Sequence, residues 1–367
     1  MLHVPYKGGG PAFAALLGRV VTSKYINPTN EVEARAAFEA KKPVRFTYTP
    51  ATWADEWLRT LDRIRPPEHP LGAVLNEAIV EVRAMAIALR DRTPQAMDKW
   101  GAIAGWLESP WVGAGEGAGR YDGAVHQGEP HGGPERTGES RDFPAFAVRA
   151  QAESTCTARE LSAALEAALR EQGLHTWRVE SDPVMSARVL VDSLRCVIRV
   201  NPRAMCTPIE LRALVAHEVG VHVRRSVNGA RQRLVIFQHS LPRSLDTEEG
   251  LALHAEAEAV GLPPGTVERQ AYFAEKVLRG RELGFTDLAN EIRRETGANP
   301  WLMCLRIKRA LANPELPGAY AKDRVYWLGI LRVAAYFRAG GEKERLMVGK
   351  VGLHHPIEEW VREGWVV

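Results

Sequence analysis

The sequence lacks the features that mark several large classes of protein. It carries 48 Lys and Arg residues against 45 Asp and Glu residues, which gives a formal net charge of only +3 over 367 residues. A protein that binds nucleic acid by neutralising phosphates normally has a concentrated basic excess, so we expect no nucleic-acid partner. No window approaches the roughly 18 uninterrupted apolar residues that a membrane-spanning helix needs, so we expect no membrane partner.

The chain also lacks signs of secretion or of a cysteine scaffold. Residues 1–10 contain no apolar stretch of the kind found in a signal peptide, and we therefore expect a cytoplasmic protein. The four cysteines, Cys156, Cys196, Cys206 and Cys304, have no CxxC spacing that would build a zinc site. Four cysteines are too few for a disulfide framework in this length, so we expect buried free thiols.

Apolar spacing in the remaining sequence predicts a mainly helical α+β protein with a small antiparallel sheet. The segment 42–50 alternates like a short strand. Helical spacing covers residues 53–64, 71–89, 98–107 and 157–171, and most segments from residue 207 onward. The sheet is expected from three short alternating runs, at residues 177–180, 188–191 and 196–201.

The helix that begins near Thr207 contains the residues most suited to chemistry. Thr207 and Glu210 form a predicted capping box, and the helix that follows is apolar except for a few residues, among them His217, Glu218 and His222. Burying such polar groups is unfavourable without a partner, and a zinc ion bound by two neutral imidazoles is the usual one. The alternative is a pair of hydrogen-bonded core histidines beside a carboxylate on the helix face.

The spacing of these residues is HExxxH, with the two histidines five residues apart. On a regular α-helix five residues turn through about 500°, so the two side chains diverge by about 140° and cannot share a metal. A single turn with i to i+5 hydrogen bonds restores convergence, and Gly220 lies where such a distortion costs least. Glu218 is then placed to accept a proton from water bound to the metal.

A third protein ligand is needed if zinc keeps one position open for water. The segment Thr247-Glu248-Glu249-Gly250-Leu251-Ala252 opens a later helix and supplies two candidates. Acids in a first helical turn are also favoured by the helix dipole, so physical reasoning leaves both Glu248 and Glu249 open.

These motifs resemble the tyrosine carboxypeptidase family, a group of HExxxH metallopeptidases that includes microtubule-associated and bacterial QEGLA-motif members. The resemblance runs from about residue 25 to 355 and omits the Gly-rich stretch. The matching pieces are residues 26–30, Phe38, residues 46–50, His217–His222, Arg225, Asn228-Gly229, Gln232, Thr247–Ala252, Lys322–Tyr326, Gly329 and residues 349–351. Val221 departs from the Thr that the family often has there.

The resemblance implies a zinc metallopeptidase with particular residues at its site. Its ligands would be His217, His222 and Glu249, because members with QEGLA keep only the second acid of the pair. Glu218 would be the general base. A carboxypeptidase must also hold the terminal carboxylate of its substrate, and we expect Arg225, Lys322, Arg324 or Tyr326 to do so. Structural roles for these residues, in capping, ion pairing or the core, are the alternative.

The function expected from this reasoning is zinc-dependent hydrolysis of a C-terminal amide bond of a peptide or protein. Two alternatives remain: a metallohydrolase that processes a modified peptide in a biosynthetic pathway, and a non-catalytic regulatory protein that retains the metal-site fold. Because the resemblance spans both sides of the Gly-rich stretch, we expect one large unit. It would comprise a helical part (1–107), a flexible insertion without a GxxxxGK[ST] phosphate-binding pattern (108–144), and a metallopeptidase core (145–367).

Overall fold

The computed structural model describes residues 23–109 apart from 67 and 69, residues 155–261 apart from 184 and 186, and residues 266–367. The expected insertion at 108–144 lies almost wholly outside the described residues, so the division of the chain into three parts stays a prediction. Within the described ranges, no helix is long and apolar enough to cross a membrane.

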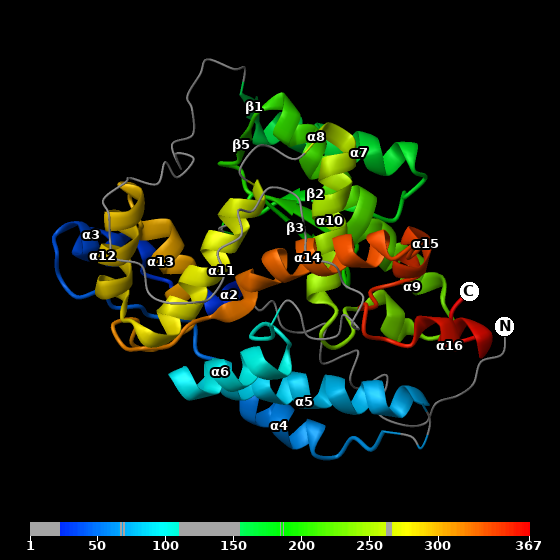
Figure 1. Ribbon diagram of the computed structural model, residues 1–367, viewed down its shortest axis with the longest axis horizontal. Coiled ribbons are helices and arrows are strands. Elements are labelled where there is room, and N and C mark those ends of the chain that lie inside the picture. The colour runs from blue at the N-terminus through cyan, green and yellow to red at the C-terminus, as the bar shows by residue number, and fades with distance from the viewer. Residues whose placement is uncertain are drawn as a thin grey trace.

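Helices dominate the described chain, as the apolar spacing predicts (Figure 1). In chain order the α-helices are α2 (Ser23–Ile26), α3 (Glu31–Glu39), α4 (Ala54–Leu61), α5 (Pro70–Asp91), α6 (Pro94–Ile103), α7 (Ala158–Glu171), α8 (Pro208–His217), α9 (Arg224–Arg231), α10 (Leu245–Val260), α11 (Thr266–Glu282), α12 (Phe285–Thr296), α13 (Trp301–Lys308), α14 (Val325–Arg338), α15 (Lys343–Met347) and α16 (Ile357–Arg362). A π-helical turn, η1 (Glu218–Val223), and two 3-10 turns, η2 (Val235–Gln238) and η3 (Ala321–Arg324), complete the helical set.

The start of α6 differs from the sequence-based prediction. Residues 98–107 have the apolar spacing, but the helix begins four residues earlier, at Pro94. Thr93 precedes it in extended conformation, and its hydroxyl accepts a hydrogen bond from the backbone N–H of Ala96. Proline fits the first helical position because its missing N–H would be unpaired there anyway. The capping residue, rather than the apolar spacing, therefore sets this boundary.

The small sheet lies before the HExxxH helix, as expected, and the α+β class is confirmed. Its strands β2 (Arg178–Ser181), β3 (Val189–Asp192) and β4 (Val197–Val200) are ordered β2-β4-β3. Strands β3 and β4 pair antiparallel, whereas β2 joins β4 in parallel, so this sheet is mixed. A second, two-stranded antiparallel sheet is formed by β1 (Cys156–Thr157) and β5 (Met205–Cys206).

The expected strand at residues 42–50 is an extended segment without strand pairing among the described residues. Its alternation is real, because Val44 and Phe46 are buried while their neighbours are more exposed. The backbone N–H of Val44 donates to the Glu315 carboxylate instead of to a neighbouring strand. The alternation therefore reflects burial of one side of the segment against the helices.

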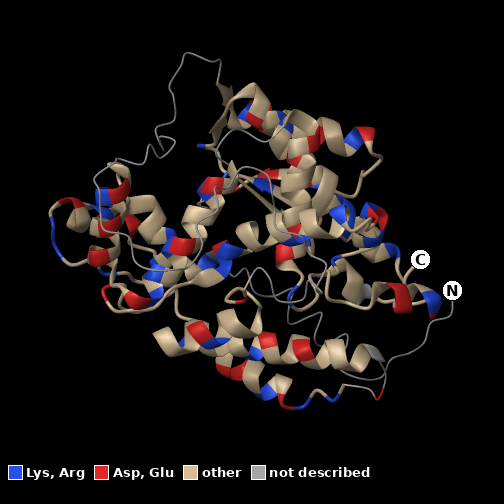
Figure 2. Ribbon diagram, viewed as in Figure 1, with Lys and Arg blue, Asp and Glu red and all other residues tan. Residues whose placement is uncertain are grey.

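Helices α10 and α14 cross in the middle of the molecule (Figure 1). Helix α10 also packs against α8 and η1, and α7 and the mixed sheet cover the other side of these two elements. Helices α4, α5 and α6 form a layer on one side of this centre (Figure 1). Charges of both signs are interspersed over most elements, in keeping with the small net charge (Figure 2).

Two glycines allow α10 and α14 to touch through their backbones. A Cβ added at Gly250 would lie 2.4 Å from the carbonyl oxygen of Gly329. A Cβ added at Gly329 would lie 2.2 Å from the carbonyl oxygen of Asp246. No side chain fits at either position, so this contact fixes the depth and the rotation of α10, the helix that carries Glu248 and Glu249.

Candidate metal centre

The HExxxH segment forms the local distortion that its spacing requires. Helix α8 begins with the predicted capping box, in which Glu210 and Thr207 bond to each other's backbone N–H. It ends at His217, and η1 continues it with π-helical hydrogen bonding through His222. A π turn adds one residue to the helical repeat, and it brings the two histidines back to one face. The prediction of an i to i+5 turn at this place is confirmed.

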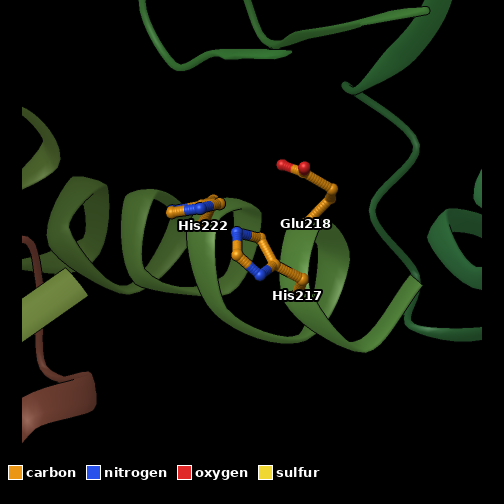
Figure 3. Close-up of side chains that lie close together, drawn as sticks. All are labelled: His217, Glu218 and His222. Carbon is orange, nitrogen blue, oxygen red and sulfur yellow. The ribbon is translucent and has the colours of Figure 1, made fainter. Parts of the chain in front are cut away.

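The two histidine rings converge beside Glu218 (Figure 3). Their centroids lie 4.8 Å apart, and all three side chains are buried. One ligand atom from each of the three residues lies within 4.8 Å of the other two. Gly220 leaves free space within η1, because an added Cβ would meet no atom within 4 Å.

Glu249 reaches the same point from α10. Its Oε2 lies 3.5 Å from Nε2 of His217 and 3.8 Å from Nε2 of His222. Ligand atoms around a tetrahedral zinc ion are about 3.3 Å apart, given bond lengths of about 2.0–2.1 Å. Glu249 Oε2 is also buried without a hydrogen-bond partner among the described residues, which is costly unless something else binds it. The chemistry and spacing of these three donors fit a zinc ion.

Each histidine is held by a second carboxylate. Nδ1 of His217 lies 2.6 Å from Oε1 of Glu256, and Nδ1 of His222 lies 2.7 Å from Oε1 of Glu248. A carboxylate at Nδ1 favours the tautomer that carries its proton there, which leaves the Nε2 lone pair free for a metal. Both Nε2 atoms face Glu249, so the orienting bonds agree with the proposed ligand set.

The structure thus separates the two acids that physical reasoning left open. Glu249 faces both Nε2 atoms, whereas Glu248 points to His222 Nδ1 and to the Lys350 ammonium, 2.6 Å away. Burial favours protonated Glu248, but the charge of Lys350 and the hydrogen bond to His222 outweigh it and hold the pKa of this carboxyl well below its usual range. Glu248 is therefore an ionised orienting group.

Arg225 has a structural role, which corrects its expected role in substrate binding. Its side chain is 0% exposed, and its guanidinium donates to the backbone carbonyls of Leu346, Gly349 and Val351. It also lies 3.7 Å from Glu248. A guanidinium enclosed in this way cannot reach a substrate. Arg324 is likewise buried, and its guanidinium donates to the backbone carbonyls of Trp106 and Glu108.

Lys322 lies in η3 and Tyr326 at the start of α14. The Glu249 charge is the main reason that the pKa of Tyr326 is raised well above its usual value, with burial second. Burial opposes ionisation of Glu249, but His217 and His222 lower the pKa of this carboxyl, and the charge of Lys322 adds a smaller contribution in the same direction. Lys322 is half-buried, and its ammonium forms no hydrogen bond or ion pair with the described residues.

Sequence reasoning missed Glu256 and Lys350 as parts of this centre. Glu256 follows Glu249 by seven residues, which is two helical turns on the same face of α10. The seven-residue spacing therefore indicates in the sequence that Glu256 shares a helix face with Glu249. Lys350 is distant in sequence from Glu248, and no local pattern identifies it.

Comparisons with known proteins identify the family of this chain. The family model described as microtubule-associated tyrosine carboxypeptidase matches residues 141–367, more than half of the chain. The human protein named microtubule-associated tyrosine carboxypeptidase 1 is 29% identical over 166 residues, which cover 42% of this chain and 34% of that protein. The corresponding mouse protein is 30% identical over 171 residues, with the same coverage.

A human protein named putative tyrosine carboxypeptidase MATCAP2 is 29% identical over 133 residues, or 34% of this chain and 25% of that protein. The matched region therefore spans about a third or less of the length of these relatives. The family match includes the HExxxH turn, the segment from Thr247 to Ala252, and Lys322. The chain belongs to the microtubule-associated tyrosine carboxypeptidase family.

Proposed function

We propose that this protein is a zinc-dependent carboxypeptidase that hydrolyses the C-terminal amide bond of a peptide or protein. The observation that carries the proposal is the buried Oε2 of Glu249, which has no hydrogen-bond partner among the described residues and lies 3.5 and 3.8 Å from two imidazole nitrogens whose rings are oriented by other carboxylates. His217, His222 and Glu249 would hold the zinc ion. The names of these relatives, which are tyrosine carboxypeptidases, support the reaction class.

The roles of the chain's own residues follow from their positions. A zinc ion held here would supply a Lewis acid that polarises the scissile carbonyl and makes water more acidic. Glu218, adjacent to the first histidine, takes a proton from the attacking water and returns it to the leaving amine. Glu256 and Glu248 keep the two imidazoles in the tautomer that presents Nε2.

In this proposal, the ammonium of Lys322 binds the C-terminal carboxylate of the substrate. A carboxypeptidase distinguishes a terminal carboxylate from an internal amide by its charge, and Lys322 has an ammonium near Glu249 that is free of partners among the described residues. The phenol of Tyr326 is protonated at neutral pH, and the Glu249 charge and burial raise its pKa further. It can therefore donate a hydrogen bond to the bound substrate.

The test combines metal analysis with a library of peptides that differ only in the C-terminal residue, including tyrosine, read by mass. We expect one zinc ion per chain and loss of a single C-terminal residue. Glu218→Gln should keep the zinc ion and lose about 10²–10⁴-fold in rate, whereas Glu249→Ala should lose both. Retention of activity by Glu218→Gln, or failure of the wild type to bind zinc, would refute the proposal.

A further inference from the structure

Two of the four cysteines face each other across the short sheet formed by β1 and β5. Cys156 lies directly opposite Cys206 in this antiparallel pair. Residues opposed in this way project to the same face of a sheet, with Cα atoms about 4.5–5.5 Å apart. A disulfide needs a Cα separation of about 4.4–6.8 Å, so the backbone here already has the spacing of a cross-link.

The side chains of this pair are also close. Burial and the neighbouring Cys156 thiol, in that order, raise the pKa of Cys206. Both cysteines are free thiols, with Cys206 buried and Cys156 half-buried. The expectation of buried thiols thus holds for Cys206 and Cys304, whereas Cys156 and Cys196 are half-buried.

The surroundings of the two cysteines are nearly equivalent. The chain reads Cys-Thr-x-x-Glu at residues 156–160 and again at 206–210. In both copies the Thr and the Glu close a capping box, so that each cysteine lies immediately before the capping threonine of a helix, α7 or α8. Because two rigid helix starts hold the pair, the opposition of the thiols does not depend on a loop.

We propose that Cys156 and Cys206 form a reversible disulfide that joins the amino-terminal ends of α7 and α8. The oxidant is a small-molecule disulfide of the glutathione type. The Cys156 thiolate, on the more accessible side, attacks one sulfur of the oxidant, forms a mixed disulfide and releases one small thiol. Cys206 then attacks the Cys156 sulfur and releases the second thiol. The protein loses two electrons and two protons, and the oxidant gains them.

The cross-link would stabilise the element that carries the metal centre. Helix α8 ends at His217, and the closed loop between the two cysteines includes the whole mixed sheet. Closing a loop of this size restricts the unfolded chain and raises stability if native geometry is kept. We expect Tm to rise by roughly 3–5 °C on oxidation.

The experiment treats the folded, full-length protein with excess oxidised glutathione and maps peptides without a reductant. The expected product is one linked peptide pair that contains Cys156 and Cys206, with two thiols remaining and a higher Tm that dithiothreitol reverses. Cys304→Ser, the control, should cross-link like the wild type. Cys206→Ser should stop at the mixed disulfide on Cys156, and Cys156→Ser should form no link.

Three results would overturn the proposal. The first is a wild type that accumulates only mixed disulfides or remains unreacted. The second is a linked peptide pair that contains Cys196 or Cys304 instead. The third is a lower Tm after the expected link has formed. Two single variants are used so that the test does not depend on one of them folding. Cys156 is half-buried, so we expect Cys156→Ser to fold even if Cys206→Ser, at a buried position, does not.

Discussion

At the scale of single residues, Glu248 and Glu256 offer a matched test of how the histidines are oriented. Each carboxylate bonds one Nδ1, but Glu248 is buried beside Lys350 whereas Glu256 is partly exposed. Loss of an orienting partner typically weakens metal binding by about 10–100-fold. We expect both Glu248→Gln and Glu256→Gln to weaken zinc binding in this range, measured with a competing chelator.

The two variants should differ in stability. Glu248→Gln removes the charge that pairs with Lys350 and Arg225, so we expect a loss of about 3 kcal/mol in the free energy of unfolding. Glu256→Gln should change that free energy much less, because among the described residues Glu256 is partly exposed and pairs with His217 but with no Lys or Arg. Equal stability of the two variants in denaturant titrations would contradict the assignment of Glu248 as the centre of a buried ion network.

Lys322 gives a second prediction at this scale. A charge-assisted hydrogen bond contributes about 1.5–3 kcal/mol, so Lys322→Ala should lower kcat/KM by about 10–100-fold on peptides with a free C-terminal carboxylate. Zinc content should stay unchanged. Lys343→Ala, a change to a lysine that pairs with Glu258 on the surface, is the control and should have no effect. A Lys322→Ala variant with wild-type kcat/KM would exclude Lys322 as the carboxylate anchor.

At the scale of elements, two glycine substitutions test separately how the α10–α14 contact and the π turn affect stability and zinc binding. A Cβ at Gly250 would collide with the Gly329 carbonyl, whereas a Cβ at Gly220 would meet nothing within 4 Å. Overpacking costs about 1–3 kcal/mol, so Gly250→Ala should lower Tm and weaken zinc binding. Gly220→Ala should retain both. Thermal denaturation of the zinc-loaded and zinc-free forms checks this, and a stable Gly250→Ala variant would contradict it.

The sequence predicted those elements whose causes are local. The capping box at Thr207 and the five-residue spacing of His217 and His222 were sufficient to predict both the start of α8 and the π turn. The parallel pairing of β2 with β4 was not predictable, because it depends on which strands meet after folding. The enclosure of Arg225 by carbonyls from residues 346–351 is equally non-local.

At the scale of the whole molecule, one charged network connects distant parts of the chain. The backbone N–H of Arg243 donates to Glu81 on α5, and the Arg243 side chain pairs with Glu108. Arg332 on α14 bonds both Glu108 and Asp246 on α10. Burial raises the pKa of Glu81 to about 7, so this network includes a group that titrates near neutral pH.

The sign of the resulting pH dependence follows from linkage. Between pH 4.5 and 7 the folded protein holds a proton on Glu81 that the unfolded chain has lost, so this group makes stability fall as pH rises through that window. Glu81→Gln removes the titrating group. We expect its Tm to exceed that of the wild type at pH 8 and the difference to shrink towards pH 5. Glu33→Gln, a change to an exposed carboxylate on α3, should give no such trend in parallel melts.

Helix α10 carries three carboxylates that contact the histidines. The rotation of α10 about its own axis determines which imidazole nitrogen each carboxylate reaches. Glu249 and Glu256 share one face and reach His217, while Glu248, one residue earlier, reaches His222. Adding one residue to the helix before Glu248 would turn all three by about 100°, so they would be misdirected together, whereas point substitutions remove them singly. The directions of these three carboxylates are therefore coupled, and the close contact of Gly250 with the Gly329 carbonyl sets their common orientation.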